Sequence, residues 1–296
     1  MKNIHFIVNP IAGRGNNGLD NALLDTYFPG DAYLVVVKYS ERKKHAIALA
    51  IASLKEGASV IVACGGDGTV NEVASVLVNT DIPLGIIPLG SGNGLASHLK
   101  IPADQALALD IIKKQLSARI DVGCCNGAYF FSNTGVGFDA EVIRNYEGAG
   151  SRKLTAYTKA CIKAFFGREK ACPLEVSVDG GKYYKDPYLI FISNSNEMGY
   201  SFSLTPGASL QDGLLDVLIV PNMNKIRFLL FGILMLFKKH VSLKGVVNYQ
   251  TRQLRLNRND HSFFGLQMDG EYKILPTGVI TIELLHAALS VISGSV

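Results

Sequence analysis

The sequence predicts two domains of different class: an α/β domain over residues 1–121 and a larger, mainly-β domain over residues 122–296. Three observations lead to this division. Apolar runs alternate with helical patterns up to about residue 115, glycine-rich turns follow several of these runs, and short strand-like runs with Asn-Gly and Asp-Gly turns take over from Arg119. Alternation is typical of a parallel sheet covered by helices, and the later pattern of an antiparallel sandwich or barrel. It stays open whether the last ~10 residues return to the first domain.

In the first domain, the strands are expected where the apolar runs are richest in β-branched residues. They are IHFIV (4–8), YLVVV (33–37), SVIVACG (59–65) and PLGIIPLG (83–90). The helices expected around them are NALLDTYF (21–28), HAIALAIASLKEG (45–57), EVASVLVN (72–79) and ADQALALDIIKKQ (103–115). Gly57 would end the second helix as its C-cap. Because parallel sheets bind ligands at the carboxyl ends of their strands, we expect a site at that edge.

In the second domain, strand-like runs dominate. They lie within residues 119–138, 174–194, 212–220, 253–257 and 278–285. Two helices are expected to interrupt them, over residues 152–166 and 225–240.

The composition limits the function classes. A net charge of +4 is too mild to indicate a nucleic-acid-binding protein. The five cysteines are unevenly spaced and form no CxxC pair, which fits reduced thiols better than disulfides or a zinc site. The N-terminus MKNIHFIVNP begins directly with a strand-like run and shows no signal-peptide pattern. We therefore expect a cytoplasmic protein that does not bind nucleic acid.

Three glycine-rich loops follow predicted strands: residues 9–18, 65–72 and 88–96. The first contains GxGxxG, but four residues separate the strand from its first glycine, which disfavours a dinucleotide fold. It looks more like a phosphate loop with Asn9 and Arg14 beside an anion, and a plain surface loop is the alternative. All three loops should share one edge of the sheet, where glycine lets backbone amides approach phosphates and helix N-termini favour anions.

Asp67 stands among the glycines of the second loop, GGDGTVNE. A carboxylate would repel a phosphate unless a cation stood between them, and a magnesium ion held through water does this. The loop therefore points to a metal-bound nucleotide. Thr69 can offer its hydroxyl to a phosphate, and Glu72 also has a plain capping role at the start of its helix.

GGDGTVNE resembles the signature of the diacylglycerol kinase catalytic family, which includes sphingosine, ceramide and bacterial lipid kinases. Supporting segments follow in matching order up to about residue 285: NPIAGRG, PLGSGNGLA, RIDVG, FSNTGVGFDAEV, DGLLDVLIV and MDGE. GGDGT alone is shared with NAD kinases and 6-phosphofructokinases. The resemblance implies a Rossmann-like first domain, a larger antiparallel β-sandwich, and transfer of the γ-phosphoryl group of ATP to a lipid hydroxyl with Mg²⁺. The acceptor would be diacylglycerol, phosphatidylglycerol or a sphingoid base.

The resemblance also implies functional residues. The nucleotide would be lined by Asn9, Pro10, Gly13, Arg14, Ser40, Gly65, Gly66, Asp67, Gly68, Thr69, Asn71 and Ser91. Asp67 and Asp121 would hold the catalytic magnesium through waters, with a turn aspartate as the alternative interpretation of Asp121. Asp269 or Glu271 of MDGE would accept the proton of the lipid hydroxyl. Taken without the family, MDGE is an ordinary hairpin turn.

A structural magnesium ion is implied beside DGLLDV. It would be held by Asp212 and by backbone carbonyls near Ser209 and Leu214, and the plain alternative is a turn before a strand.

Two departures from the family pattern concern the loop PLGSGNGLA. Gly94 stands where an aspartate is usual, and Ser97 where a basic residue is often found. Sphingosine kinases also lack that aspartate, which points weakly to a long-chain base. Two alternatives stay open: a soluble-substrate kinase similar to NAD kinases, and an ATP-binding regulator without catalysis.

The segment 228–237 is the longest apolar run, and no window is long enough for a transmembrane helix. Basic residues flank it, and residues 217–259 contain no acidic residue. Such a segment suits the surface of an anionic bilayer, while a helix packed on the second domain is the competing interpretation. We expect a peripheral membrane protein with a lipid substrate, and a homodimer stays possible.

Overall fold

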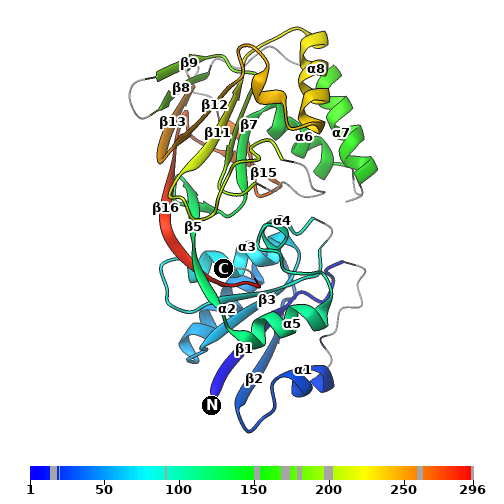
Figure 1. Cartoon of the computed structure of the whole chain (residues 1–296), viewed down its shortest axis with the longest axis vertical. Coiled ribbons are helices and arrows are strands. Elements are labelled where there is room, and N and C mark those ends of the chain that lie inside the picture. Colours follow the sequence, from blue (N-terminus) through cyan, green and yellow to red (C-terminus); the bar gives the residue numbers. More distant parts are fainter. Residues whose placement is uncertain are drawn as a thin grey trace. The chain divides into compact units, whose positions relative to one another are not determined.

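The computed structural model describes residues 1–13, 19, 21–90, 92–149, 154–167, 174–178, 182–196, 203–258 and 263–294 (Figure 1). The chain forms two compact units. Unit 1 comprises residues 1–121 with 287–296, and unit 2 comprises residues 122–286. The chain leaves unit 1 within β5 (Ser117–Cys125) and returns within β16 (Val279–Ile292). The sequence of unit 2 is therefore inserted into that of unit 1.

Unit 1 is built on a parallel sheet with the strand order β2–β1–β3–β4, followed by the end of β16. Val291 of β16 pairs in parallel with Leu84 of β4. Every residue of β3 and β4 is buried, as expected for central strands covered on both faces. The α/β fold predicted for this part is confirmed. Its elements are β1 (Lys2–Val8), α1 (Asn21–Tyr27), β2 (Tyr33–Tyr39), α2 (His45–Lys55), β3 (Val60–Gly65), α3 (Asp67–Leu77), β4 (Leu84–Pro88), α4 (Gly94–His98) and α5 (Gln105–Lys114).

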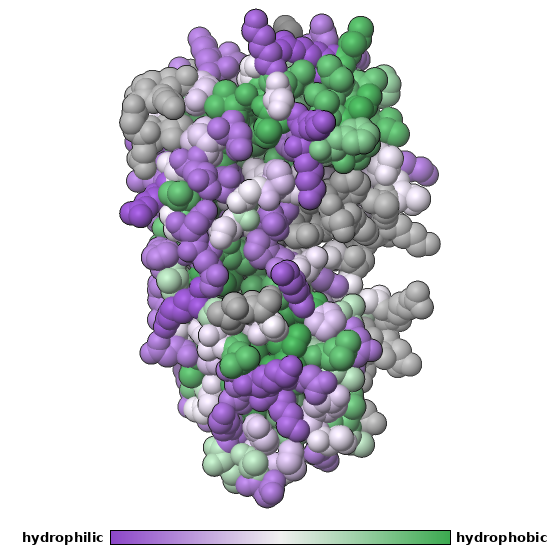
Figure 2. All heavy atoms as spheres, in the orientation of Figure 1, coloured by the Kyte–Doolittle hydropathy of each residue, from purple (hydrophilic) through white to green (hydrophobic). Residues whose placement is uncertain are grey.

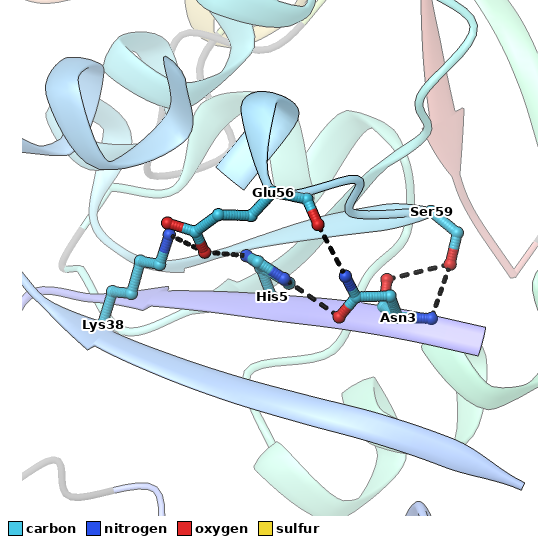
Figure 3. A network of polar contacts seen from close by, with 5 residues as sticks. All are labelled: Asn3, His5, Lys38, Glu56 and Ser59. Atoms are coloured by element: carbon cyan, nitrogen blue, oxygen red, sulfur yellow. Dashed lines mark hydrogen bonds and ion pairs between the residues drawn. The ribbon is translucent and has the colours of Figure 1, made fainter. Parts of the chain in front are cut away.

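A polar network joins the end of α2 to the amino ends of β1 and β3 (Figure 3). Glu56 accepts a bond of 2.8 Å from Lys38 Nζ and lies 3.7 Å from His5 Nδ1. Asn3 contacts His5 Nε2 at 3.0 Å and exchanges backbone bonds with the Ser59 hydroxyl. Burial lowers the pKa of His5, the charge of Lys38 adds to this, and Glu56 opposes it. Asn3 and Ser59 lie at the amino ends of β1 and β3, and Lys38 reaches the network from near the end of β2. The network joins these strands to the end of α2, so we assign it a role in stability.

Unit 2 is a sandwich of two antiparallel sheets. One sheet has the order β12–β11–β10–β7–β14–β15, and the other joins β16, β13, β8 and β9. Their inner faces meet in one core, with Val176 and Leu254 on one side and Ile190 and Leu266 on the other. Two facing sheets of this kind make a β-sandwich, so the barrel alternative is wrong. The remaining strands are β6 (Ala128–Phe130), β7 (Asn133–Gly137), β8 (Leu174–Val178), β9 (Lys182–Lys185), β10 (Leu189–Ser193), β11 (Leu215–Val220), β12 (Val247–Thr251), β13 (Gln253–Arg258), β14 (Phe264–Met268) and β15 (Glu271–Leu275).

The helices of unit 2 are α6 (Phe138–Glu147), α7 (Leu154–Phe166), α8 (Lys225–Leu236) and the 3₁₀ helix η1 (His240–Ser242). α6 is not among the predicted helices, because the glycine-rich sequence before it suggests further strands. α8 is shorter than predicted: Lys238 adopts a left-handed φ of 56°, which ends the helical path before η1. None of the described helices is long and apolar enough to span a membrane.

Candidate functional site

The glycine loops of unit 1 pack against each other through their backbones. A Cβ atom at Gly90 would lie 2.6 Å from the Cα of Gly66, and one at Gly66 would lie 3.2 Å from the Cα of Gly90. A Cβ atom at Gly65 would lie 2.5 Å from Thr69 Oγ1. A side chain at Gly90 does not fit beside Gly66, so this glycine is required for the contact between the two loops, while Gly65 leaves room for the Thr69 side chain of its own loop. The sequence analysis assigned these glycines to phosphate binding alone.

Asn9 links the first loop to the second. Its Nδ2 donates to Thr69 Oγ1 at 3.3 Å, and its Oδ1 accepts the backbone N–H of Ile11 at 3.2 Å. Its own N–H donates to the carbonyl of Cys64 at the end of β3. Pro10 and Gly13 continue the same turn, while Arg14 and Ser91, two predicted nucleotide ligands, lie outside the described residues.

Asp67 is the first residue of α3, and its carboxylate holds the loop before α4. Oδ2 accepts the N–H of Asn93 at 2.8 Å, and Oδ1 accepts the N–H of Gly94 at 2.7 Å. A Cβ atom at Gly92 would lie 2.9 Å from Oδ2. Each carboxylate oxygen can accept a second hydrogen bond, so the arrangement is compatible with a cation held through water. In this structure Asp67 joins two loops, which the sequence did not indicate.

Asn93 was not predicted as a site residue, although it stands in the SGNG segment. Its Oδ1 accepts the N–H of Gly90 at 3.0 Å, and its Nδ2 donates to the Gly90 carbonyl at 2.8 Å. Its backbone is left-handed, with φ of 53°. Asparagine tolerates this conformation and closes such turns with its side chain, which is the signal that could have identified it.

Glu72 is a capping residue, but it caps a different helix from the one expected. Its Oε1 accepts the N–H of Lys44 at 2.8 Å, and its Oε2 accepts the N–H of Ala46 at 3.2 Å. These groups belong to the N-terminus of α2, whose Lys44 is left-handed. Glu72 thereby fixes the loop after β2, in which Ser40 donates its N–H to Val8 at 2.8 Å. Glu72, the last residue of the GGDGTVNE segment, therefore positions the neighbouring loop between β2 and α2.

Asp121 is fully buried, and its Oδ1 accepts the N–H of Ala287 at 2.7 Å. Ala287 has a left-handed φ of 49°, so the carboxylate holds a strained residue at the point where β16 re-enters unit 1. Among the described residues, no group of three or more His, Cys, Asp or Glu side chains could hold a metal ion. Magnesium binding by Asp67 and Asp121 stays a prediction.

Asp269 and Gly270 form the two-residue turn between β14 and β15. Both are left-handed, with φ of 47° and 77°, and Met268 pairs with Glu271 across the turn. This is the type I′ hairpin that Asp-Gly favours. The hairpin interpretation of MDGE is therefore correct, and it does not exclude a catalytic role.

The Asp269 carboxylate is held by three consecutive backbone N–H groups. Oδ2 accepts from Phe131 at 2.8 Å, and Oδ1 accepts from Ser132 at 2.8 Å and from Asn133 at 3.1 Å. The N–H of Asp269 donates in return to the carbonyl of Asn133 at 2.9 Å. Bonds from N–H groups to a carboxylate are among the stronger hydrogen bonds in proteins. Asp269 therefore anchors the hairpin onto the start of β7. The half-buried Glu271 is the first residue after the Asp269–Gly270 turn.

The predicted structural metal site contains a second carboxylate that was not predicted. Asp212 Oδ1 accepts the N–H of Leu214 at 3.0 Å, as in an ordinary turn, and Ser209 Oγ accepts the N–H of Gln211. The Gln250 amide nitrogen lies 3.2 Å from both Asp212 Oδ2 and Asp216 Oδ2. Burial raises the pKa of Asp216, the Gln250 bond lowers it, and the charge of Asp212 raises it again. Two neighbouring carboxylates can hold a cation between them. Metal binding at this place stays a prediction.

The likeness to known proteins extends over both units. Residues 3–125 match the model of the diacylglycerol kinase catalytic domain, and residues 132–293 match that of the YegS C-terminal NAD kinase beta sandwich-like domain. The chain belongs to the diacylglycerol kinase catalytic-domain family. This is a family of lipid kinases, and the resemblance carried by GGDGTVNE and MDGE is confirmed.

Named diacylglycerol kinases are similar to the chain over nearly its full length. The Bacillus subtilis enzyme is 28% identical over 287 residues, which cover 92% of this chain and 90% of that protein. The Staphylococcus aureus enzyme is 30% identical over 292 residues, covering 95% and 90%. An uncharacterized Synechocystis protein is 30% identical over 231 residues, and the chain spans only 52% of its length.

Solved structures share the fold of this family member. Two chains from Bacillus anthracis Sterne superpose with TM-scores of 0.80 and 0.72, at 24% and 22% identity. They cover 99% of this chain and 96% and 97% of their own lengths, and the second is described as a diacylglycerol kinase. The α/β plus β-sandwich fold class predicted for the chain is confirmed.

Proposed function

We propose that the protein is an ATP- and magnesium-dependent lipid kinase that transfers the γ-phosphoryl group of ATP to a lipid hydroxyl. The observation that carries this proposal is the set of interlocked glycine loops at the carboxyl edge of the parallel sheet, with Asp67 at the start of α3. Backbone amides and a helix N-terminus suit phosphates. Family membership supports ATP as the phosphoryl donor.

Asp67, with Asp121, would hold the magnesium ion through water in this proposal. The ion would neutralise charge that develops on the phosphoryl oxygens. Side chains of the protein hold the loops in place. Asn9 orients Thr69, and Asn93 closes the loop before α4, whose backbone N–H groups donate to Asp67. The residues at this edge would thus bind and orient the nucleotide, while Asp212 and Asp216 would hold a structural ion in unit 2.

Glu271 is our choice for the group that accepts the proton of the lipid hydroxyl. Both oxygens of Asp269 are bonded to the backbone of residues 131–133, which suits an anchor. Glu271 is the next carboxylate along the same rigid hairpin. A general base must be held in place by a fixed element, and a type I′ turn anchored by three N–H groups provides that.

We further propose that the protein docks peripherally on anionic membranes through α8. The helix packs through Phe228 and Phe231, so the packed-helix interpretation is also correct. Its other side is exposed, with Ile226 at 82%, Leu229 at 60% and Leu236 at 63%. Figure 2 shows hydrophobic side chains gathered where Figure 1 places α8. Anionic lipid heads would meet the flanking basic residues, and apolar contacts would follow.

A groove of about 640 Å³ along α6 and α7 carries further basic side chains, among them Arg144, Lys159 and Lys163. Basic side chains beside an apolar surface are typical of proteins that bind anionic bilayers.

The test is transfer of labelled phosphate from MgATP into lipids in mixed micelles. The panel contains diacylglycerol, phosphatidylglycerol and sphingosine, because these classes present a hydroxyl at the bilayer surface. We expect one class to be labelled by the parent and not by Glu271→Gln. Glu283→Gln, an exposed glutamate on β16, is the matched control and should keep full activity.

An unlabelled panel with ATP still bound would contradict the lipid kinase. It would favour the ATP-binding regulator or a soluble acceptor, and NAD would be tested next.

A further inference from the structure

The segment 131–133, whose N–H groups hold the Asp269 carboxylate, is itself held through its carbonyls. Asn194 is the first residue after β10, and its side-chain Nδ2 donates to the carbonyl of Phe131 at 3.0 Å. Asn194 is 0% exposed and Phe131 is 2% exposed, so water does not compete for this bond. A buried carbonyl that loses its donor destabilises the segment that carries it.

One rigid peptide group connects this bond to Asp269. The carbonyl of Phe131 and the N–H of Ser132 belong to the same peptide plane, which resists twisting. Asn194 Nδ2 donates to the oxygen of that plane, and the N–H of the plane donates to Asp269 Oδ1 at 2.8 Å. The bond at the oxygen therefore directs the N–H, and each of the two bonds strengthens the other.

Backbone bonds hold the next peptide group and do not duplicate this contact. The N–H groups of Asn194 and Ser195 donate to the carbonyl of Ser132 at 2.9 Å and 3.0 Å. That carbonyl shares its peptide plane with the N–H of Asn133, which donates to Asp269 Oδ1 at 3.1 Å. The side chain and the backbone of Asn194 thus act on two successive peptide groups, and truncating the side chain removes the first of these supports.

Gln267 of β14 supports the same turn by a separate route. Its Oε1 accepts the N–H of Gly270 at 3.1 Å, and its Nε2 donates to Asn133 Oδ1 at 2.7 Å. Gly270 is the second left-handed residue of the turn. The turn is therefore held twice, because Gln267 fixes Gly270 directly, whereas Asn194 acts on Asp269 through a peptide group.

We propose that Asn194 is a positioning residue that acts through the Phe131–Ser132 peptide group to hold Asp269, and with it Glu271, in place. Asn194 is fully buried, so its effect on the reaction is indirect. This inference rests on the proposed lipid kinase activity, with Glu271 as the base, for its kinetic consequence. Its structural part, the Ser132 N–H directed by Asn194, does not depend on the activity.

The kinetic experiment compares Asn194→Ala and Asn194→Asp with the parent. We expect Asn194→Ala to lower kcat about tenfold with KM for ATP unchanged, as for loss of one buried hydrogen bond. Asn194→Asp keeps the size of the side chain but replaces the donor nitrogen by oxygen, so it should lose at least as much. If Asn194→Ala does not fold, Asn194→Ser takes its place, because its side chain is too short to reach Phe131.

A double variant tests the coupling to Asp269. Asn194→Ala should cost less in an Asp269→Asn background than in the parent, because both residues act in one chain of contacts. Amide hydrogen exchange at Ser132 supplies a readout that needs no activity. We expect it to rise about tenfold in Asn194→Ala, relative to exchange at Leu218 in the centre of β11.

Val176→Ala is the control for destabilisation. It removes volume from the core of unit 2 on β8 and does not belong to the chain of contacts. It should lower Tm and leave both kcat and the relative exchange at Ser132 unchanged.

Three results would overturn the inference: an unchanged kcat in Asn194→Ala, unchanged exchange at Ser132 in that variant, or an equal loss from Asn194→Ala with and without Asp269→Asn. Full activity of Asn194→Asp would do the same, because this variant lacks the donor. If the parent transfers no phosphate to any lipid, the proposed function fails by itself. The exchange measurements then decide the inference about Asn194.

Discussion

Asp67 in unit 1 and Asp269 in unit 2 are both aspartates in glycine-rich turns, and both carboxylates accept backbone N–H groups. Asp67 accepts two, one on each oxygen, from the loop before α4. Asp269 accepts three from consecutive residues, and its own N–H bonds back to the same segment. The first pattern joins two loops that follow parallel strands, whereas the second locks a hairpin. Similar sequence therefore serves two purposes: Asp67 suits a water-held cation, and Asp269 suits an anchor.

The largest effect is expected when the two carboxylates of the hairpin, Asp269 and Glu271, are replaced one at a time. These variants test whether Asp269 is an anchor. We expect Glu271→Gln to lower kcat about 10³-fold, within the range for loss of a general base, with Tm unchanged. Asp269→Asn should instead lower the free energy of unfolding by about 2 kcal/mol, because it weakens charge-assisted bonds. Steady-state kinetics and thermal melts measure both. A large kcat loss in Asp269→Asn without a change in Tm would reverse the two roles.

Gly90→Ala would test whether the loops of unit 1 depend on backbone contact. The new Cβ atom would lie 2.6 Å from the Cα of Gly66, so a backbone must move. We expect a loss of about 3 kcal/mol in the free energy of unfolding, the upper end for overpacking, and weaker ATP binding by titration calorimetry.

The control for this variant is Gly30→Ala, where a Cβ atom meets nothing within 4 Å. It should leave both quantities unchanged. Equal behaviour of the two variants would mean that the loops move apart freely.

Asp139 extends the comparison to a third, fully buried carboxyl group, which should make unit 2 sensitive to pH. Its pKa is raised from 3.8 to about 7 in the folded protein by burial. The folded state therefore holds an extra proton between these values, and stability falls as pH rises towards 7. Asp139→Asn removes this dependence. Relative to the variant, the parent should lose about 2 kcal/mol between pH 5.5 and pH 8, measured by urea unfolding at both values.

If the parent loses no stability relative to Asp139→Asn between these pH values, or gains some, Asp139 is already ionised in the folded state at pH 5.5.

The smallest expected effect concerns α8. Lys238→Gln and Lys239→Gln should each weaken binding to vesicles containing anionic lipid about fivefold, since each basic residue near such a surface contributes about 1 kcal/mol. Binding to neutral vesicles should not change, and Lys55→Gln at the end of α2 in unit 1 is the control. Equal loss with neutral vesicles would exclude an electrostatic contribution.

Local patterns were sufficient to predict the parallel sheet, a mainly antiparallel second domain and the MDGE hairpin. Alternation of apolar residues and the Asp-Gly pair act over a few residues, so sequence reveals them directly. The partners of the site residues were not predictable in this way. Glu72 caps a helix that begins 27 residues earlier, at His45. The contact between Gly66 and Gly90 joins loops that only the sheet brings together.

The site residues that the sequence did not predict were missed for the same physical reason. Asn93, Asp216 and Gln267 each act through partners that are distant in sequence or that need a defined backbone to be reached. A signal existed only for Asn93, since asparagine in a glycine-rich loop favours a left-handed turn. For Gln267, a polar residue in an otherwise apolar strand does not by itself reveal which groups it contacts.

The return of β16 to unit 1 has a consequence for synthesis on the ribosome. In this segment Val291 pairs with β4, the carbonyl of Ala288 accepts the N–H of Asn79, and Ala287 donates its N–H to Asp121. These residues emerge after all of unit 2. The domain that begins first therefore completes its sheet last, and the inserted sandwich can fold while its host still lacks a strand. A chain truncated after residue 286 and released from the ribosome should accordingly expose unit 1, and not unit 2, to proteases.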